Sequence, residues 1–252
     1  MSESQKTVGK LEIIVETYQD IVAAIQGGAT QLDLKAHYPS SGVSPSAGII
    51  ARAIRDFKVP VMVMVRPHAR TFVMNKEDIC TACEEIKQAR QLGAQHFLTG
   101  FLTEDNDLDT EALKQLKDAA GDSSLHSHLA WELSRDPLRS LEQLIELGFC
   151  SVRASGKTAS SGAFGGDVSK AIATIIDYQK VLAGRMELFM AGGVDVENID
   201  ELILQTGITN LHCGRSARTP KTAEAPVNEE RVRALRSAQM DAIVRLEKKM
   251  KI

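Results

Sequence analysis

Short apolar runs recur along the chain, and amphipathic stretches separate them. The runs are rich in Val, Ile, Leu and Met, and we interpret them as strands that do not alternate with polar residues. Such runs are typical of parallel strands that are buried on both faces of a sheet. The eight predicted strands are Leu11–Val15, Gln31–Leu34, Val59–Val65, Phe97–Thr99, Leu125–Ala130, Ser151–Ala154, Met186–Met190 and Asn210–Cys213.

Helical patterns lie between these runs, as in the stretches 18–26, 75–92, 110–120 and 229–249. Alternation of strands and helices predicts a parallel sheet with crossover helices, and eight such units close into a barrel. The main rival is an open, doubly wound sheet, but no Gly-x-Gly-x-x-Gly turn follows the first strand. The sequence therefore predicts an α/β fold, a (β/α)8 TIM barrel, as a single domain over residues 1–252. Within it we expect a flexible N-terminus at 1–9 and a loop at 218–228.

Composition narrows the class of protein. The chain is 43% hydrophobic and 25% charged with a formal net charge of -3, which argues against nucleic acid and acidic membranes as partners. Four cysteines in 252 residues do not make a disulfide framework. The polar N-terminus lacks the apolar segment of a signal peptide, and the longest apolar run is too short to cross a bilayer. We expect a cytoplasmic protein without membrane contact.

Charged and titratable residues stand in or directly after five predicted strands. Barrels carry their chemistry at the carboxyl ends of the strands, and ionised groups inside a barrel require partners or a ligand. We therefore predict that these residues line one pocket as catalytic acid–base and anion-binding groups, with the Arg paired to a carboxylate. The alternative is a structural ion network inside the barrel. The candidate catalytic residues are Glu12, Asp33, Arg66, His128 and His212.

Glycines and small residues follow the sixth, seventh and eighth predicted strands. Many barrels bind phosphate after the last two strands through backbone N–H groups, and an adjoining Arg adds charge. The alternative is that these glycines only form tight turns. The candidate residues for binding an anion or cofactor are Ser155, Gly156, Gly192, Gly193, Gly214 and Arg215.

Cys80 and Cys83 form a Cys-x-x-Cys spacing within the predicted helix at 75–92. A soft metal or a redox pair would use such a spacing, but no second pair of ligands stands nearby. We interpret both as ordinary helix residues.

Short motifs in register over residues 11–213 resemble the CutC family, whose members are barrel proteins assigned to copper homeostasis. Each motif is short, and it is their order that carries the resemblance. The matching segments are Leu11–Ile13, Gly28–Leu34, Ser41–Ser46, Val63–Pro67, His128–Glu132 with Asp136-Pro137, Ser155-Gly156, Gly192–Val194 and Leu211–Cys213.

The resemblance implies a barrel, a role in copper handling, and a homodimer or larger oligomer. This chain has Ile14 and Lys35 where the family has the cysteines proposed to bind Cu(I), so copper would have to use other ligands, of which His212 and Cys213 are the best candidates. The alternative function is a barrel enzyme of the lyase, isomerase or hydrolase type. It would act on a small polar or phosphorylated metabolite; its cofactor stays open, with a divalent cation or copper as the candidates.

Overall fold

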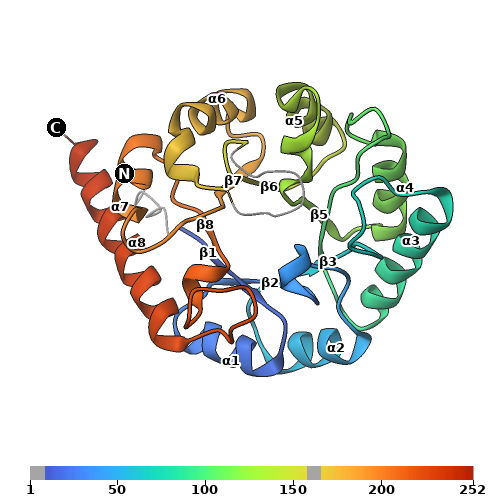
Figure 1. The fold of residues 1–252 in the computed structure, drawn as a ribbon, viewed down its shortest axis with the longest axis horizontal. Helices are drawn as coiled ribbons and strands as arrows, with labels where there is room; N and C mark the ends of the chain where they lie inside the picture. The colour runs from blue at the N-terminus through green and yellow to red at the C-terminus, as the bar shows by residue number, and fades with distance from the viewer. Residues whose placement is uncertain (1–8, 158–165, 252) are drawn as a thin grey trace, which may run out of the picture.

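The computed structural model describes residues 9–157 and 166–251, and in them eight parallel strands form a closed barrel ringed by helices (Figure 1). Strand β1 pairs with β2 on one side and with β8 on the other, which closes the sheet. The predicted TIM barrel is confirmed. The strands are β1 (Leu11–Val15), β2 (Gln31–Leu34), β3 (Val61–Met64), β4 (His96–Thr99), β5 (Ser124–Ser127), β6 (Ser151–Ala154), β7 (Glu187–Met190) and β8 (Leu211–Cys213).

Helices follow the strands, and several begin at a side-chain cap. Thr17 and Asn75 each accept a backbone N–H of the following helix and complete a capping box, which satisfies N–H groups that the helix leaves unpaired. Asp136 caps its helix, with Pro137 in the first turn. The α-helices are α1 (Tyr18–Gln26), α2 (Ala47–Asp56), α3 (Lys76–Gln91), α4 (Thr110–Ala120), α5 (Pro137–Glu146), α6 (Ile172–Leu182), α7 (Ile199–Thr206) and α8 (Glu229–Lys249); four short 3-10 helices are η1 (Tyr38–Ser40), η2 (Leu129–Leu133), η3 (Val168–Ala171) and η4 (Arg215–Ala217).

The hydrophobic core lies between the barrel wall and the helices. In β1, Leu11, Ile13 and Val15 belong to this core, whereas Glu12 and Ile14 do not. A separate small cluster, Met62, Met64 and Leu98, comes from alternate residues of β3 and β4. Because successive side chains of a strand point to opposite faces, the outward positions meet helices and the inward positions fill the barrel.

The inward positions are polar in several strands, and this corrects the expectation that the strands do not alternate. The patterns Gln-Leu-Asp-Leu in β2, Ser-Val-Arg-Ala in β6 and Leu-His-Cys in β8 alternate, although every residue in them is buried. Register places Glu12 opposite Gln31 on β2 and His212 on β8. The barrel interior is therefore lined by charged groups that three separate strands bring together.

Four strands are shorter than predicted, and the seventh and eighth differ by one residue only. The third begins after Pro60, which has no N–H to give to a ladder, and its carbonyl accepts the N–H of Leu32. The fifth ends at Ser127, because His128 caps η2 through a bond from the Ala130 N–H to Nδ1.

The segment 218–228 lies between η4 and α8, as the composition predicts. Of the predicted N-terminus, residues 1–8 lie outside the described residues. Within the described chain, no helix combines the length and apolar character that crossing a bilayer requires.

Candidate functional site

A pocket of about 220 Å3 opens at the carboxyl end of the barrel strands. Its floor comes from inward residues of the strands, and its rim comes from the loops after β2, β5, β7 and β8. This is the end where barrels carry their sites. The polar side chains and glycines among the described residues that line it are Asp33, Lys35, Tyr38, Ser41, His128, Arg153, Gly192, Gly193, Asp195, His212, Gly214, Arg215, Ser216 and Lys221.

Glu12 is the centre of a fully buried network beneath this pocket. Arg153 Nε donates to Glu12 Oε1 at 2.8 Å, and its NH2 group donates to Oε2. Gln31 also donates to Oε2, and His212 Nδ1 lies 2.6 Å from Oε1. Both carboxylate oxygens are thus satisfied by groups from β2, β6 and β8.

The charge of Glu12 is fixed by these partners. Burial by itself raises the pKa of a carboxyl group, but the Arg153 charge and the bonds from His212 and Arg153 outweigh it and hold the pKa of Glu12 well below its ordinary value. Glu12 is therefore ionised at neutral pH inside the barrel. Its bidentate pairing with Arg153 is the geometry in which a buried ion pair repays its lost hydration.

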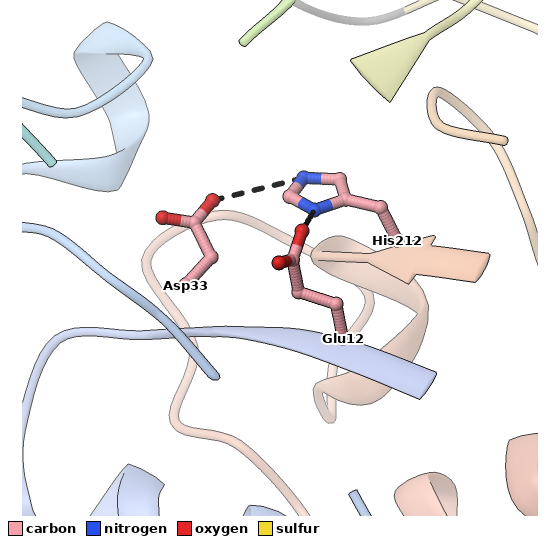
Figure 2. A group of neighbouring side chains, drawn as sticks. All are labelled: Glu12, Asp33 and His212. Carbon is pink, nitrogen blue, oxygen red and sulfur yellow. Dashed lines mark hydrogen bonds and ion pairs between the residues drawn. The ribbon is translucent and has the colours of Figure 1, made fainter. Parts of the chain in front are cut away.

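His212 connects this network to the pocket. With Nδ1 bonded to Glu12, its other ring nitrogen lies 3.8 Å from Asp33 Oδ2, as Figure 2 shows. Lys35 Nζ lies 2.8 Å from the same Asp33 oxygen, and both side chains are almost fully buried. The mouth of the barrel therefore holds two carboxylates, each beside a cation, with an imidazole between them.

His128 lines the same pocket from the end of β5. Its Nδ1 accepts the Ala130 N–H at 3.1 Å, so in the neutral ring the proton is on Nε2. Burial, and next the charge of Arg66, hold the pKa of His128 well below its ordinary value. His128 is therefore neutral at physiological pH.

Arg66 does not pair with Glu12 or Asp33, and the prediction of that ion pair is wrong. Its guanidinium donates to backbone carbonyls of two loops at 3.1–3.4 Å, and it lies over the Phe72 ring at 4.2 Å. Desolvation lowers its pKa to about 10. The carbonyls, which the sequence does not reveal as partners, bind the two terminal NH2 groups of the guanidinium, while its Nε has no hydrogen-bond partner among the described residues. Arg66 thereby joins the loop after β2 to the loop after β3. The carbonyls belong to Ser40, Gly42, Ala69 and Thr71.

The glycines after β7 and β8 lie at the pocket rim with Arg215. Asp195 on the same rim is paired with Lys221 and with Arg231 at 2.5 and 2.8 Å. Arg215 is exposed, and no ion pair joins it to another described residue. It is thus the cation at the rim that has no acidic partner in the described chain.

Ser155 and Gly156 lie apart from the described pocket lining. The Glu132 carboxylate accepts the backbone N–H and the hydroxyl of Ser155 at 2.8 and 2.7 Å. Gly156 packs so closely on Ala171 that a Cβ would approach the Ala171 Cβ to 2.3 Å. In the described chain both residues organise the loop after β6.

His212 and Cys213 cannot bind one ion together. They are successive residues of β8, so His212 faces the barrel interior while Cys213 packs in the outer core. Burial raises the pKa of the Cys213 thiol to about 12, which keeps it from forming a thiolate. Cys80 is exposed and Cys83 half-buried on α3, as predicted for helix residues.

The geometry allows a test of whether the site suits a metal ion. Glu12, Asp33 and His212 each offer a ligand atom, and these atoms lie within 4.8 Å of one another. However, Arg153 and Lys35 already neutralise the two carboxylates, and the donor set of two carboxylates and one imidazole suits a hard or borderline ion more than Cu(I). These residues do not fit a Cu(I) site.

Sequence reasoning missed two of the site's cations and one histidine. Arg153 is the main partner of Glu12. It could have been recognised as a buried cation, because it stands within a strand whose residues are all buried. Lys35 was read as a departure from a family pattern and not as a site residue. His126, a residue of β5 that was not among the predicted site residues, lies inside the barrel, where its Nδ1 is 2.7 Å from Ser151 Oγ.

Fold and site together define a (β/α)8-barrel protein with a pocket lined by charged residues at the carboxyl ends of its strands. The profile of the CutC family matches residues 9–217. The chain is 32% identical to the CutC protein of Pasteurella multocida over 224 residues, which covers 87% of this chain and 89% of that one. It is 34% identical to CutC of Porphyromonas gingivalis over 203 residues, 81% of this chain and 79% of the relative.

Solved structures agree with this. A structure described as the putative copper homeostasis protein CutC from Streptococcus agalactiae superposes with a TM-score of 0.75 at 28% identity, over 82% of this chain and 98% of that one. The chain belongs to the CutC family. A phosphoribosylanthranilate isomerase from Thermotoga maritima superposes with a TM-score of 0.59 at 12% identity, over 93% of this chain and 100% of that one, a likeness of fold alone.

Proposed function

We propose that this protein is an enzyme that binds a small anionic metabolite in the barrel mouth and moves a proton through His212. One observation carries the proposal: a histidine that lines the pocket has its inner nitrogen 2.6 Å from a buried, ionised carboxylate. A carboxylate in that position orients the ring and stabilises its protonated form.

The roles of the two residues follow from their positions. His212 Nδ1 donates to Glu12, so in the neutral ring Nε2 is the nitrogen with a free electron pair. That nitrogen is on the side of Asp33, which lines the pocket. His212 would accept a proton from bound substrate there, and Glu12 would balance the imidazolium charge. Glu12 acts as a positioning residue, because His212 and Arg153 cover its oxygens.

Charge at the rim supports an anionic ligand. Arg215 has no acidic partner among the described residues, and Gly192, Gly193 and Gly214 line the pocket beside it. A phosphate or carboxylate group that met Arg215 and these backbone N–H groups would gain charge-assisted hydrogen bonds.

Calorimetric titration tests the binding half of this proposal. The probes are inorganic phosphate, a sugar phosphate and an uncharged sugar of the same size. We expect the two anions to bind more tightly than the sugar, and Arg215→Ala to weaken their binding by about tenfold or more. The matched control is Arg233→Ala, which removes an exposed Arg of α8 that is paired with Glu229. Equal affinity of both variants would overturn the anion site.

Turnover tests the chemical half. Protein incubated with a pool of small phosphorylated and carboxylated metabolites should deplete a compound, as measured by mass spectrometry. His212→Asn should bind that compound and turn it over about a hundredfold more slowly, since loss of a general acid–base group costs that much. His37→Asn, on an exposed loop, is the control. Unchanged turnover in His212→Asn would overturn the assigned role.

Copper homeostasis is the second candidate, since a relative of known structure carries that description. The described pocket residues offer His128, His212 and the Met64 thioether to a copper ion, but no thiol. Thiolates are the ligands that Cu(I) prefers. The donor set therefore favours the enzyme proposal, and we expect Cu(I) to bind weakly.

A further inference from the structure

Lys35 is a buried amine at the pocket, and the proposed role of His212 does not use it. It follows β2 directly, is 5% exposed, and lines the pocket with Asp33 and His212. A buried ammonium is expensive and is usually retained for a partner or for chemistry.

Asp33, the acidic residue beside Lys35, is not in hydrogen-bond geometry with the amine. Lys35 Nζ is 2.8 Å from Asp33 Oδ2, yet neither oxygen of Asp33 has a hydrogen-bond partner among the described residues. A structural ion pair would aim its N–H groups at the carboxylate oxygens. Asp33 is close enough to take a proton from the Lys35 amine. The N–H groups of Lys35 are left for other acceptors.

The surrounding backbone makes room for this side chain. Gly42 has φ of +90°, and a Cβ there would lie 2.4 Å from Lys35 Cδ. The loop after β2 therefore passes directly over the methylene chain of Lys35 at a position that only glycine allows. Arg66 donates to the Ser40 and Gly42 carbonyls of this loop. A second buried residue therefore holds the loop that covers Lys35.

We propose that Lys35 forms an iminium with a small carbonyl compound that carries an acidic group, such as a 2-oxo acid or a phosphorylated ketose. This deepens the proposed function, on which the acidic group of the ligand rests. Lys35 is then the nucleophile, Asp33 its proton acceptor, and Arg215 with the rim glycines the holder of the anionic group.

The step balances without any further reagent. Lys35 Nζ passes a proton to Asp33 and attacks the carbonyl carbon, whose oxygen takes the second proton from nitrogen. The resulting hydroxyl leaves as water with the proton that Asp33 held, and a protonated imine remains. Nothing is oxidised or reduced. The iminium makes a proton on the neighbouring carbon acidic, and His212, beside Asp33, is positioned to accept it.

Reductive trapping of the purified full-length protein tests the proposal. The protein is treated with pyruvate or dihydroxyacetone phosphate and with sodium borohydride, and modified peptides are mapped by mass spectrometry. We expect one reduced adduct per chain on Lys35, formed about tenfold or more faster than adducts on the exposed lysines. Acetone, which has no acidic group, should label Lys35 more slowly. Adducts only on exposed lysines would overturn the proposal, and this outcome requires no variant.

Two variants sharpen the result. Lys35→Arg keeps the charge beside Asp33 and should lose the adduct, whereas Lys180→Arg, at an exposed position of α6 outside the pocket, should keep it. A folded Lys35→Arg protein that is still labelled in the pocket would also overturn the proposal. If phosphate binding depends on Arg215 but Lys35 is never trapped, this inference fails and the anion site stands. If pyruvate and acetone trap Lys35 equally, the amine is reactive, but the proposal that the ligand carries an anionic group is wrong.

Discussion

Glu12 and His212 lie 200 residues apart in the chain and share a hydrogen bond of 2.6 Å inside the barrel. The bond exists because β1 and β8 are neighbours in the closed sheet, with the two residues opposite each other in register. Arg153, from the far side of the barrel, completes the pairing of Glu12. The pairing of β1 with β8 therefore closes the barrel and also brings Glu12 and His212 together.

Loss of the Glu12 charge should destabilise the protein strongly. In Glu12→Gln, the buried Arg153 guanidinium keeps its charge and loses its carboxylate, so we expect the free energy of unfolding to fall by about 3–5 kcal/mol. Urea unfolding at pH 7.5 measures this. Glu142→Gln, which breaks an exposed pair with Arg185, is the control and should barely move the midpoint. Equal effects of the two variants would mean that the buried pair contributes nothing special.

Stability should fall as the pH drops below the ordinary pKa of histidine. Burial, and next the charge of Arg153, lower the pKa of His126 to about 3 in the folded protein. The unfolded chain binds a proton near pH 6.5, so the contribution of neutral His126 is complete above that pH and is lost progressively as the pH falls toward 3. Between these limits the slope is about 1.4 kcal/mol per pH unit for one group.

Urea unfolding from pH 7.5 down to pH 5 checks this slope. His128, with its pKa also lowered, contributes in the same direction. His126→Asn should therefore reduce the slope without abolishing it, whereas His37→Asn, at an exposed position, should leave it unchanged. A wild-type protein whose stability is flat across this range would contradict the buried, neutral state of His126.

Replacement of Arg66 should loosen the mouth of the barrel. Arg66→Lys keeps a positive charge but cannot reach the four carbonyls that the planar guanidinium bonds. We expect faster amide hydrogen exchange at residues 40–42 and 69–72 and a loss of about 1–3 kcal/mol in stability. Arg52→Lys is a matched control, since this guanidinium stacks on the Tyr18 ring far from the pocket. Unchanged exchange in both loops would show that Arg66 does not hold them.

Binding of Cu(I) should be weak and independent of Cys213. The thiol is buried in the outer core with its pKa raised to about 12, and it faces away from His212. In competition against a Cu(I) chelator, Cys213→Ser should match the wild type. The double variant Cys80→Ser and Cys83→Ser should also match, because both residues are on α3 and neither lines the described pocket. Tight binding that is lost in any of these variants would restore a copper site.

The order of elements and the closed barrel follow from the sequence itself. Apolar runs with capped helices between them leave few other arrangements, and the strands in the structure lie within or beside the predicted runs. The sequence also indicated that the segments after β7 and β8 lie at the pocket, because glycines, one of them next to Arg215, are visible in the sequence itself. Residues at strand ends are predictable in the same way, since the carboxyl ends of parallel strands share one end of a barrel.

Which charges meet was decided only by the tertiary structure. The sequence pointed to Arg66 as the partner of the carboxylates, but strand register places Arg153 beside Glu12, and backbone carbonyls bind Arg66 instead. Likewise, Lys35 and Asp33 are always two residues apart in the chain. Only in the folded protein does the loop at Gly42 pack against the methylene chain of Lys35, whose side chain lines the pocket with Asp33. Short-range patterns determine elements because hydrophobic burial repeats with the helix and strand periods. Ion pairs depend on orientations that separate segments adopt only when they pack, and the sequence alone does not record those orientations.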